Sequence, residues 1–187
     1  SHFIYADHAA TTPSPIPPSS HAPHFTTAYG NPSSLYRFAQ EGKTDLERAR
    51  AEIAACLNAR PEEIYFTSGG TEADNWAAGG GRRSVALKGP EGGHIITSAI
   101  EHEAILDNLA QLKRRGFTVD ILKPGTRGVI EPGTLDAAMG DDVALVSIMF
   151  ANNETGAVQP VGELAQIAHN HGAYSTPTPY RDTLPCR

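Results

Sequence analysis

The stretch Tyr65-Phe66-Thr67-Ser68-Gly69-Gly70-Thr71-Glu72-Ala73-Asp74-Asn75 decides the fold. Residues 64–67 are β-branched or aromatic, which is typical of a buried strand. The glycines let the backbone approach a ligand closely, and Thr71 begins a helix. Because the first N–H groups of a helix have no partner within it and lie at the positive end of its dipole, they bind phosphate. The pattern predicts a strand, a phosphate loop and a helix, although an ordinary strand-to-helix turn has the same short motif.

The composition is that of a globular protein. The 187 residues are 40% hydrophobic and 19% charged, with a net charge of −6. No basic stripe and no apolar run of membrane-spanning length is present, so we expect no nucleic-acid partner, no membrane insertion and a cytoplasmic location. Cys56 and Cys186 form neither a metal-ligand spacing nor a disulfide framework, and no metal is expected. Cys56 lies in a helical pattern and is predicted to be a small core residue.

Predicted strands and helices alternate along the chain. This pattern favours a doubly wound, mainly parallel α/β sheet. The predicted strands cover residues 3–7, 64–67, 94–97, 117–122 and 143–149. Predicted helices carry Leu46, Ala49, Ile53 and Leu57, begin at Thr71, end near residue 115, and cover 132–139 and 162–171.

Three polar loops follow predicted strands: residues 68–71, 101–102 and 152–153. The carboxyl ends of parallel strands meet at one edge of a sheet, where ligands bind. Taken singly, His102 has an alternative role as a helix cap and Asn153 as a turn former. Their shared edge predicts a ligand site.

Five motifs, taken together, resemble the cysteine desulfurases of the NifS and IscS type, which are pyridoxal-phosphate enzymes of the class V aminotransferase group. The resemblance runs in order from Tyr5 to about Tyr174, and it implies the N-terminal half of the family's chain and a truncated large domain of a fold-type I transferase over residues 1–174. The motifs are residues 9–13 (AATTP), 30–34 (GNPSS), 67–75 (TSGGTEADN), 100–104 (IEHEA) and 152–156 (NNETG).

The resemblance also implies site residues. Gly70 and Thr71 would hold the phosphate of pyridoxal phosphate. His102 would stack on the pyridine ring and assist proton transfer as the catalytic residue, and Asn153 would hydrogen-bond the phenolic oxygen of the ring. An imidazole acts as acid or base near neutral pH, and a side-chain amide donates without carrying charge.

The family reaction converts L-cysteine to L-alanine and passes sulfane sulfur to an iron–sulfur scaffold or a sulfur carrier, in a homodimer. It requires a Schiff-base lysine, an aspartate on the pyridinium nitrogen and a sulfur-accepting cysteine. None of these is identifiable in the 187 residues, so we expect this chain to be inactive and to bind the cofactor non-covalently at best. The alternatives are another class V enzyme, such as a selenocysteine lyase, and a non-catalytic remnant or binding fragment.

Two stretches depart from the family pattern. Residues 13–23 contain five prolines and are expected to form neither a regular helix nor an inner strand. At residues 175–187 the expected His-Thr-Asp-Ala-Val-Gln is replaced, yet one permitted coding string contains this motif one base out of register, with the aspartate at position 178. We therefore interpret residues 175–187 as an out-of-frame tail.

Overall fold

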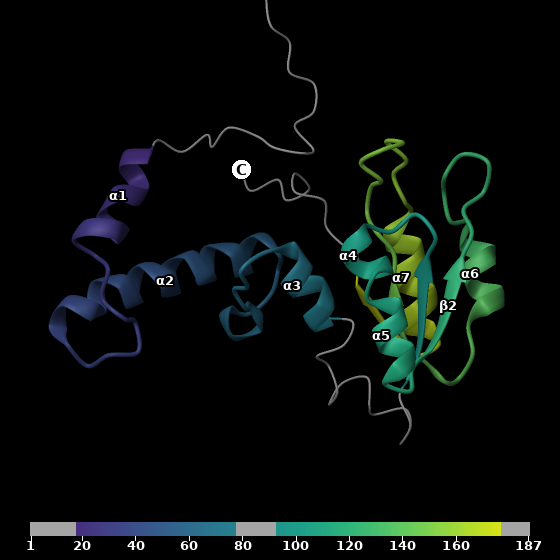
Figure 1. Cartoon of the computed structure of the whole chain (residues 1–187), viewed down its shortest axis with the longest axis horizontal. Coiled ribbons are helices and arrows are strands. Elements are labelled where there is room, and N and C mark those ends of the chain that lie inside the picture. Colours follow the sequence, from purple (N-terminus) through teal and green to yellow (C-terminus); the bar gives the residue numbers. More distant parts are fainter. Residues whose placement is uncertain (1–17, 78–92, 177–187) are drawn as a thin grey trace, which may run out of the picture. The chain divides into compact units, whose positions relative to one another are not determined.

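The computed structural model describes residues 18–77 and 93–176, which form two compact units, one up to Phe66 and one from Thr67 onward (Figure 1). The strand predicted over 3–7 lies outside the described residues, as do residues 13–17 of the proline-rich stretch and residues 177–187 of the tail.

The second unit contains a four-stranded parallel sheet. Its strands are β1 (His94–Ser98), β2 (Thr118–Leu122), β3 (Val143–Ser147) and β4 (Tyr174–Thr176), in the order β2-β1-β3-β4. The three strands predicted after residue 90 are therefore confirmed, with boundaries shifted by one or two residues. The α/β class with a parallel sheet is confirmed as well.

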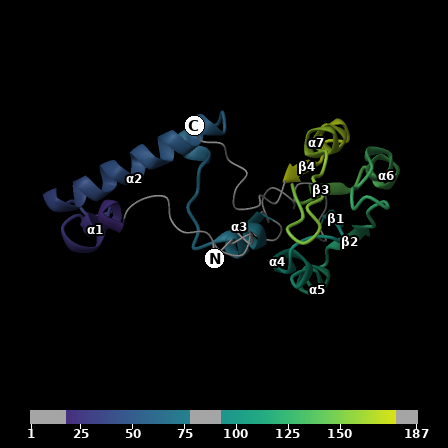
Figure 2. The same ribbon diagram turned by 90° about the horizontal axis from the view of Figure 1, so that it is seen from above.

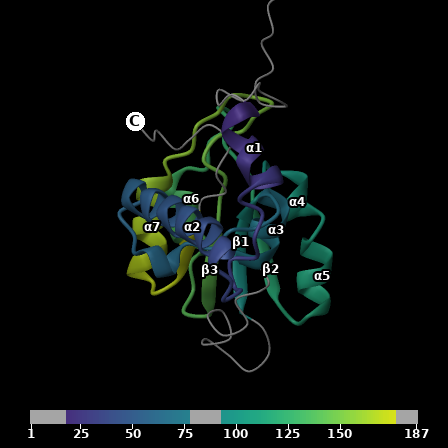
Figure 3. The same cartoon turned by 90° about the vertical axis from the view of Figure 1, so that its left-hand side faces the viewer.

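Helices cover both faces of this sheet. Figures 2 and 3 show α4 (Glu103–Leu106) and α5 (Leu109–Arg114) on one side, and α6 (Pro132–Ala138) and α7 (Val161–Asn170) on the other. Neighbouring residues of a strand point to opposite faces. Two buried clusters result: Ile95, Val119 and Leu145 with Ile105, Leu109 and Leu112, and Ile96, Leu122 and Val146 with Leu135, Leu164 and Ala168.

Glycines end two of these helices. Gly116 after α5 and Gly172 after α7 have φ values of 90° and 69°, which only glycine adopts readily. The next residue in each case donates its N–H back into the last turn, from Phe117 to Leu112 and from Ala173 to Ala168. This is the Schellman arrangement, and it turns the chain directly into the next strand.

The first unit is helical. It contains α1 (Pro18–Thr26), α2 (Arg37–Cys56) and the 3-10 helix η1 (Pro61–Glu63). The expectation that residues 13–23 exclude a regular helix is wrong from Pro18 onward. Proline is tolerated at the first helical position because that N–H has no helical partner, and α1 accommodates Pro23 in its interior.

The predicted helix through Leu46 and Ile53 is confirmed as α2. Asn58, with φ 51°, ends it in the same way as the glycines, because the N–H of Ala59 donates to the carbonyl oxygen of Ala54. The prediction that Cys56 is a core residue is wrong, since Cys56 is exposed at the end of α2. Only Ala39 and Ala54 of this helix are buried.

The strand predicted over residues 64–67 is not formed. The segment is irregular, and the side chains of Tyr65 and Phe66 are 68% and 47% exposed. The guanidinium of Arg50 donates to the carbonyl oxygen of Ile64 and lies 4.9 Å from the ring centre of Phe66. A strand needs a neighbour to pair its backbone. No described segment pairs with residues 64–67, and β-propensity alone does not replace this pairing.

Among the helices of residues 18–77 and 93–176, none has both the length and the hydrophobicity needed to cross a bilayer.

Candidate functional site

The strand order has a switch point between β1 and β3. From β1 the chain passes to β2 on one side, and it then crosses to β3 on the other side of β1. In open parallel sheets, ligands bind in the crevice at such a point, outside the carboxyl ends of the two strands. The loops with residues 101–102 and 152–153 follow β1 and β3, so they meet at this edge as the sequence predicted.

The carboxyl group of Glu101 joins these two loops. Glu101 is 6% exposed, and its Oε1 accepts a hydrogen bond from the N–H of Met149 at 2.7 Å and another from the hydroxyl of Ser98 at 2.7 Å. The first bond spans 48 residues of sequence. It fixes the start of the loop after β3 against the loop after β1.

Asn152 is buried and joins the same loops in the opposite direction. Its Nδ2 donates to the carbonyl oxygen of Ile100 at 3.0 Å. Its Oδ1 accepts from the N–H of Glu154 at 3.0 Å and from the N–H and hydroxyl of Thr155 at 2.8 and 3.0 Å. These bonds close the turn that carries Asn153, whose own side chain is exposed.

His102 caps the N-terminus of α4. Its Nδ1 accepts the N–H of Ala104 at 3.1 Å, and its side chain is exposed. A neutral imidazole has one donor and one acceptor nitrogen. With Nδ1 as the acceptor, the proton of the neutral ring lies on Nε2. The alternative role of His102 as a helix cap is therefore real, and it is compatible with a further role at Nε2.

The predicted phosphate loop leads into α3 (Gly70–Asn75), which packs against α4. The first helical bond runs from the N–H of Ala73 to Gly69, so the N–H groups of Gly70 and Thr71 have no partner within the helix. Both residues are exposed, and space around Gly70 is open within 4 Å of a Cβ position. Glu72 Oε2 accepts from the N–H and hydroxyl of Ser68, each at 2.7 Å, and these hydrogen bonds lower the pKa of Glu72.

Asp74 lies on α3 within electrostatic range of His102. Partial burial raises the pKa of the Asp74 carboxyl, and the nearby imidazole of His102 opposes this shift. The packing of α3 against α4 places the helix with Gly70 and Thr71 beside the loop that carries His102. Asn153 lies at the same edge, because the side chain of its neighbour Asn152 donates to the carbonyl oxygen of Ile100 in the loop after β1.

The sequence indicated the exposed residues of this edge but no role for the buried ones. Glu101 and Asn152 each precede a predicted site residue, His102 and Asn153. The available signal was a polar side chain shortly after a buried strand, three residues after β1 for Glu101 and five after β3 for Asn152, where burial forces it to find partners. The sequence does not specify those partners, because they lie in the other loop.

The described residues fit a phosphorylated aromatic cofactor. The N–H groups at the start of α3 and the hydroxyl of Thr71 match a phosphate. The exposed imidazole of His102 presents a flat face, and the exposed amide of Asn153 presents a neutral donor. No cluster of three metal-binding side chains occurs within the described ranges.

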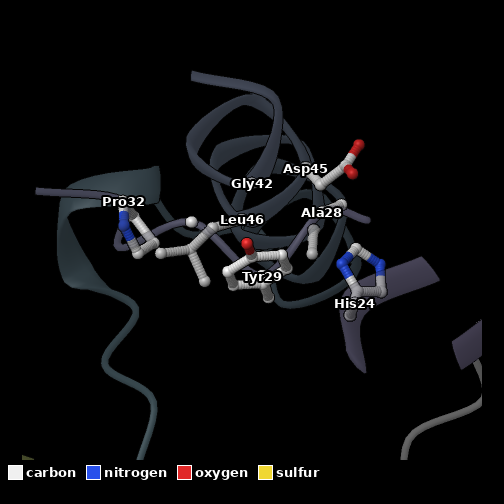
Figure 4. Close-up of a pocket in the computed structure, with 9 residues that line it drawn as sticks. His24, Ala28, Tyr29, Pro32, Gly42, Asp45 and Leu46 are labelled. Carbon is white, nitrogen blue, oxygen red and sulfur yellow. The ribbon is translucent and has the colours of Figure 1, made fainter. Parts of the chain in front are cut away.

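The first unit contains a separate pocket of about 370 Å³ (Figure 4). Residues between His24 and Ala49 line it, including Tyr29, Asp45 and Leu46. None of the four predicted cofactor-binding residues is among them.

Relatives of known name match nearly the whole chain. A cysteine desulfurase IscS of Methanosarcina thermophila is 43% identical over 173 residues, which are 91% of this chain and 42% of that protein. A putative cysteine desulfurase IscS 1 of Bacillus subtilis is 41% identical over 91% of this chain and 45% of its own length. The chain thus spans less than half the length of these relatives.

Solved structures give the same result. The structure described as SspA in complex with cysteine matches with a TM-score of 0.83 and 33% identity, over 91% of this chain and 49% of that one. DndA from Streptomyces lividans matches with a TM-score of 0.75 and 42% identity, over 92% of this chain and 48% of that one. The profile of the aminotransferase class-V family matches residues 4–176. The chain therefore belongs to the class V aminotransferase family, with similarity to the N-terminal part of IscS-type cysteine desulfurases.

Proposed function

We propose that this chain is the cofactor-binding N-terminal part of a pyridoxal-phosphate-dependent cysteine desulfurase. The observation that carries the proposal is the meeting of the His102 loop and the Asn153 loop at the switch point of the sheet, with α3 packed against α4, the helix that follows His102. Relatives with IscS names at 41 to 43% identity support it. The reaction of the whole enzyme would convert L-cysteine to L-alanine and deliver sulfane sulfur to an iron–sulfur scaffold or a sulfur carrier.

Four residues would hold the cofactor. The N–H groups of Gly70 and Thr71, with the Thr71 hydroxyl, would bind its phosphate. His102 would stack on the ring, with Nε2 as the nitrogen that carries the proton of the neutral imidazole. Asn153 would donate its amide to the phenolic oxygen. When bound, pyridoxal phosphate supplies an electron sink that stabilises negative charge on the α-carbon of an amino acid.

We further propose that the 187 residues alone do not catalyse desulfuration. No lysine, aspartate or cysteine of this sequence matches the family positions that attach the cofactor, pair its ring nitrogen and accept sulfur. An assay of alanine and sulfide release from L-cysteine, with an intact IscS as positive control, tests this. Release above the level of a Thr71→Val, Asn153→Ala double variant would contradict the proposal.

The interpretation of residues 175–187 as an out-of-frame tail is a separate proposal. The family profile match ends at residue 176, so it includes only the first two of these residues, which also form the end of β4. Sequencing of the coding DNA from the Gly172 codon onward tests it. A shifted frame that encodes His-Thr-Asp-Ala-Val-Gln is expected, and codons that exclude this motif in the shifted frame would contradict the proposal.

A further inference from the structure

Two buried side chains connect the loops at the switch point in opposite directions. Glu101, in the loop after β1, accepts the N–H of Met149 from the loop after β3 at 2.7 Å. Asn152, in the loop after β3, donates to the carbonyl oxygen of Ile100 in the loop after β1 at 3.0 Å. We call this pair of links the Glu101–Asn152 latch.

Each end of the latch is anchored further. Glu101 Oε1 also accepts the hydroxyl of Ser98 at the end of β1, at 2.7 Å. The backbone of Asn152 is bonded on both sides, since its N–H donates to the carbonyl oxygen of Ala157 at 2.9 Å and its carbonyl oxygen accepts the N–H of Gly156 at 2.8 Å. The end of β1 therefore holds Glu101, and the turn over residues 152–157 holds Asn152.

A buried latch residue immediately precedes an exposed residue in both loops. Glu101 is 6% exposed and Asn152 is 9% exposed, whereas His102 and Asn153 are exposed. A peptide bond joins each buried residue to its exposed neighbour. The position of the buried residue therefore restricts where the exposed side chain begins, and the bond from Ala104 N–H to His102 Nδ1 restricts the ring itself.

We propose that Glu101 and Asn152 are positioning residues, which hold His102 and Asn153 at a fixed spacing so that both side chains contact one flat ring. This inference rests on the proposed function, because the ring is that of the cofactor. Neither latch residue touches the ligand. The latch strengthens ligand binding, because side chains that are already held in position lose less conformational entropy when they contact the ligand.

The test compares Glu101→Ala with Glu103→Ala. The two glutamates flank His102, but Glu103 is exposed and lies outside the latch. The probe is pyridoxine 5′-phosphate, which lacks the aldehyde and so cannot form imines with surface lysines. Its affinity is measured by fluorescence titration, and the ¹⁵N shifts of the His102 ring are measured by NMR in the same samples.

For Glu101→Ala we expect loss of the single His102 tautomer and affinity weaker by about tenfold, equivalent to about 1.4 kcal/mol. Glu101→Gln retains an oxygen acceptor and is expected to restore most of both signals. Glu103→Ala is expected to change neither. A folded Glu101→Ala chain with wild-type ring shifts and wild-type affinity would overturn the inference.

Two further results separate the possible failures. If Glu101→Ala does not fold, the hydrogen-exchange rate of the Met149 amide in the wild-type chain tests the latch instead. An amide that is hydrogen-bonded to Glu101 exchanges its hydrogen slowly, so rapid exchange would refute the latch. If the wild-type chain does not bind pyridoxine 5′-phosphate, the proposed function and the positioning role fail together, whatever the Met149 exchange shows. If wild type and Glu101→Ala bind it equally, only the positioning role fails.

Discussion

The side-chain amide of Asn152 donates to the carbonyl oxygen of Ile100 at 3.0 Å and so ties the loop after β3 to the loop after β1. The same side chain closes its own turn through Oδ1. Its exposed neighbour Asn153 has no comparable burial. Two consecutive asparagines therefore have different physical roles.

Asn152→Ala should lower the free energy of unfolding by about 2 to 4 kcal/mol, because it removes several hydrogen bonds and leaves partly buried backbone groups unpaired. Asn153→Ala should change it by less than about 0.5 kcal/mol, as at other exposed positions. Urea unfolding followed by circular dichroism measures both values. Equal effects at the two positions would contradict the assignment.

A buried and an exposed glutamine, Gln159 and Gln166, allow a second comparison of matched variants. Gln159 is buried, its Oε1 accepts the N–H of Ile130 at 2.9 Å and its Nε2 donates to the carbonyl oxygen of Gly128 at 2.8 Å. We expect Gln159→Ala to cost about 2 to 3 kcal/mol of stability. Gln166→Ala, on the exposed face of α7, should cost less than about 0.5 kcal/mol. Thermal unfolding of the two variants tests this difference, and a Gln159→Ala chain as stable as wild type would exclude a structural role for these bonds.

Gly30 should not tolerate a side chain. A Cβ on the buried Gly30 would lie 2.6 Å from Cα of Ala39 in α2. We expect Gly30→Ala to destabilise the first unit by about 1 to 3 kcal/mol, since backbone atoms would have to move. Faster amide hydrogen exchange in α2 would reveal this. In Gly162→Ala, where nothing lies within 4 Å, exchange in α7 should slow or stay unchanged. Unchanged exchange in α2 of Gly30→Ala would refute the close contact.

The carboxyl of Asp74 predicts a specific pH response. Burial raises the pKa of Asp74, and His102 opposes the rise. A folded-state pKa above the unfolded value means that the folded state binds the proton more tightly. The stability contributed by this group is therefore present below the unfolded pKa and is lost as pH rises through the folded pKa. Because His102→Gln removes the imidazole that opposes the rise, the pKa of Asp74 should rise further. A ¹³C NMR titration of the carboxyl measures it, and a lower or unchanged pKa in the variant would refute the interaction.

The sequence predicted the second unit better than the first. Residues 143–149 are apolar except for Ser147, which predicts a strand buried on both faces of a sheet, and β3 forms there. Residues 64–67 have the same β-forming residue types, yet they are irregular, because pairing depends on a neighbour that local sequence does not specify. The proline-rich stretch shows the converse: Pro18 stands at a helix start, which proline favours, and α1 continues through Pro23 although proline disfavours a helix interior.

At the candidate site the sequence indicated the loops and, by resemblance, Gly70, Thr71, His102 and Asn153. It did not indicate that Glu101 and Asn152 connect the loops, because these contacts span 48 and 52 residues. It also left open which ring nitrogen of His102 is the acceptor. This depends on the cap bond from Ala104.

Titration of the purified chain with pyridoxine 5′-phosphate, monitored by the intrinsic fluorescence of the ligand, shows whether these loops form a cofactor site. We predict saturable binding that Thr71→Val and Asn153→Ala each weaken by about tenfold or more, because each variant loses one directed polar contact. The absence of saturable binding, or equal binding by wild type and both variants, would show that these loops do not form a cofactor site.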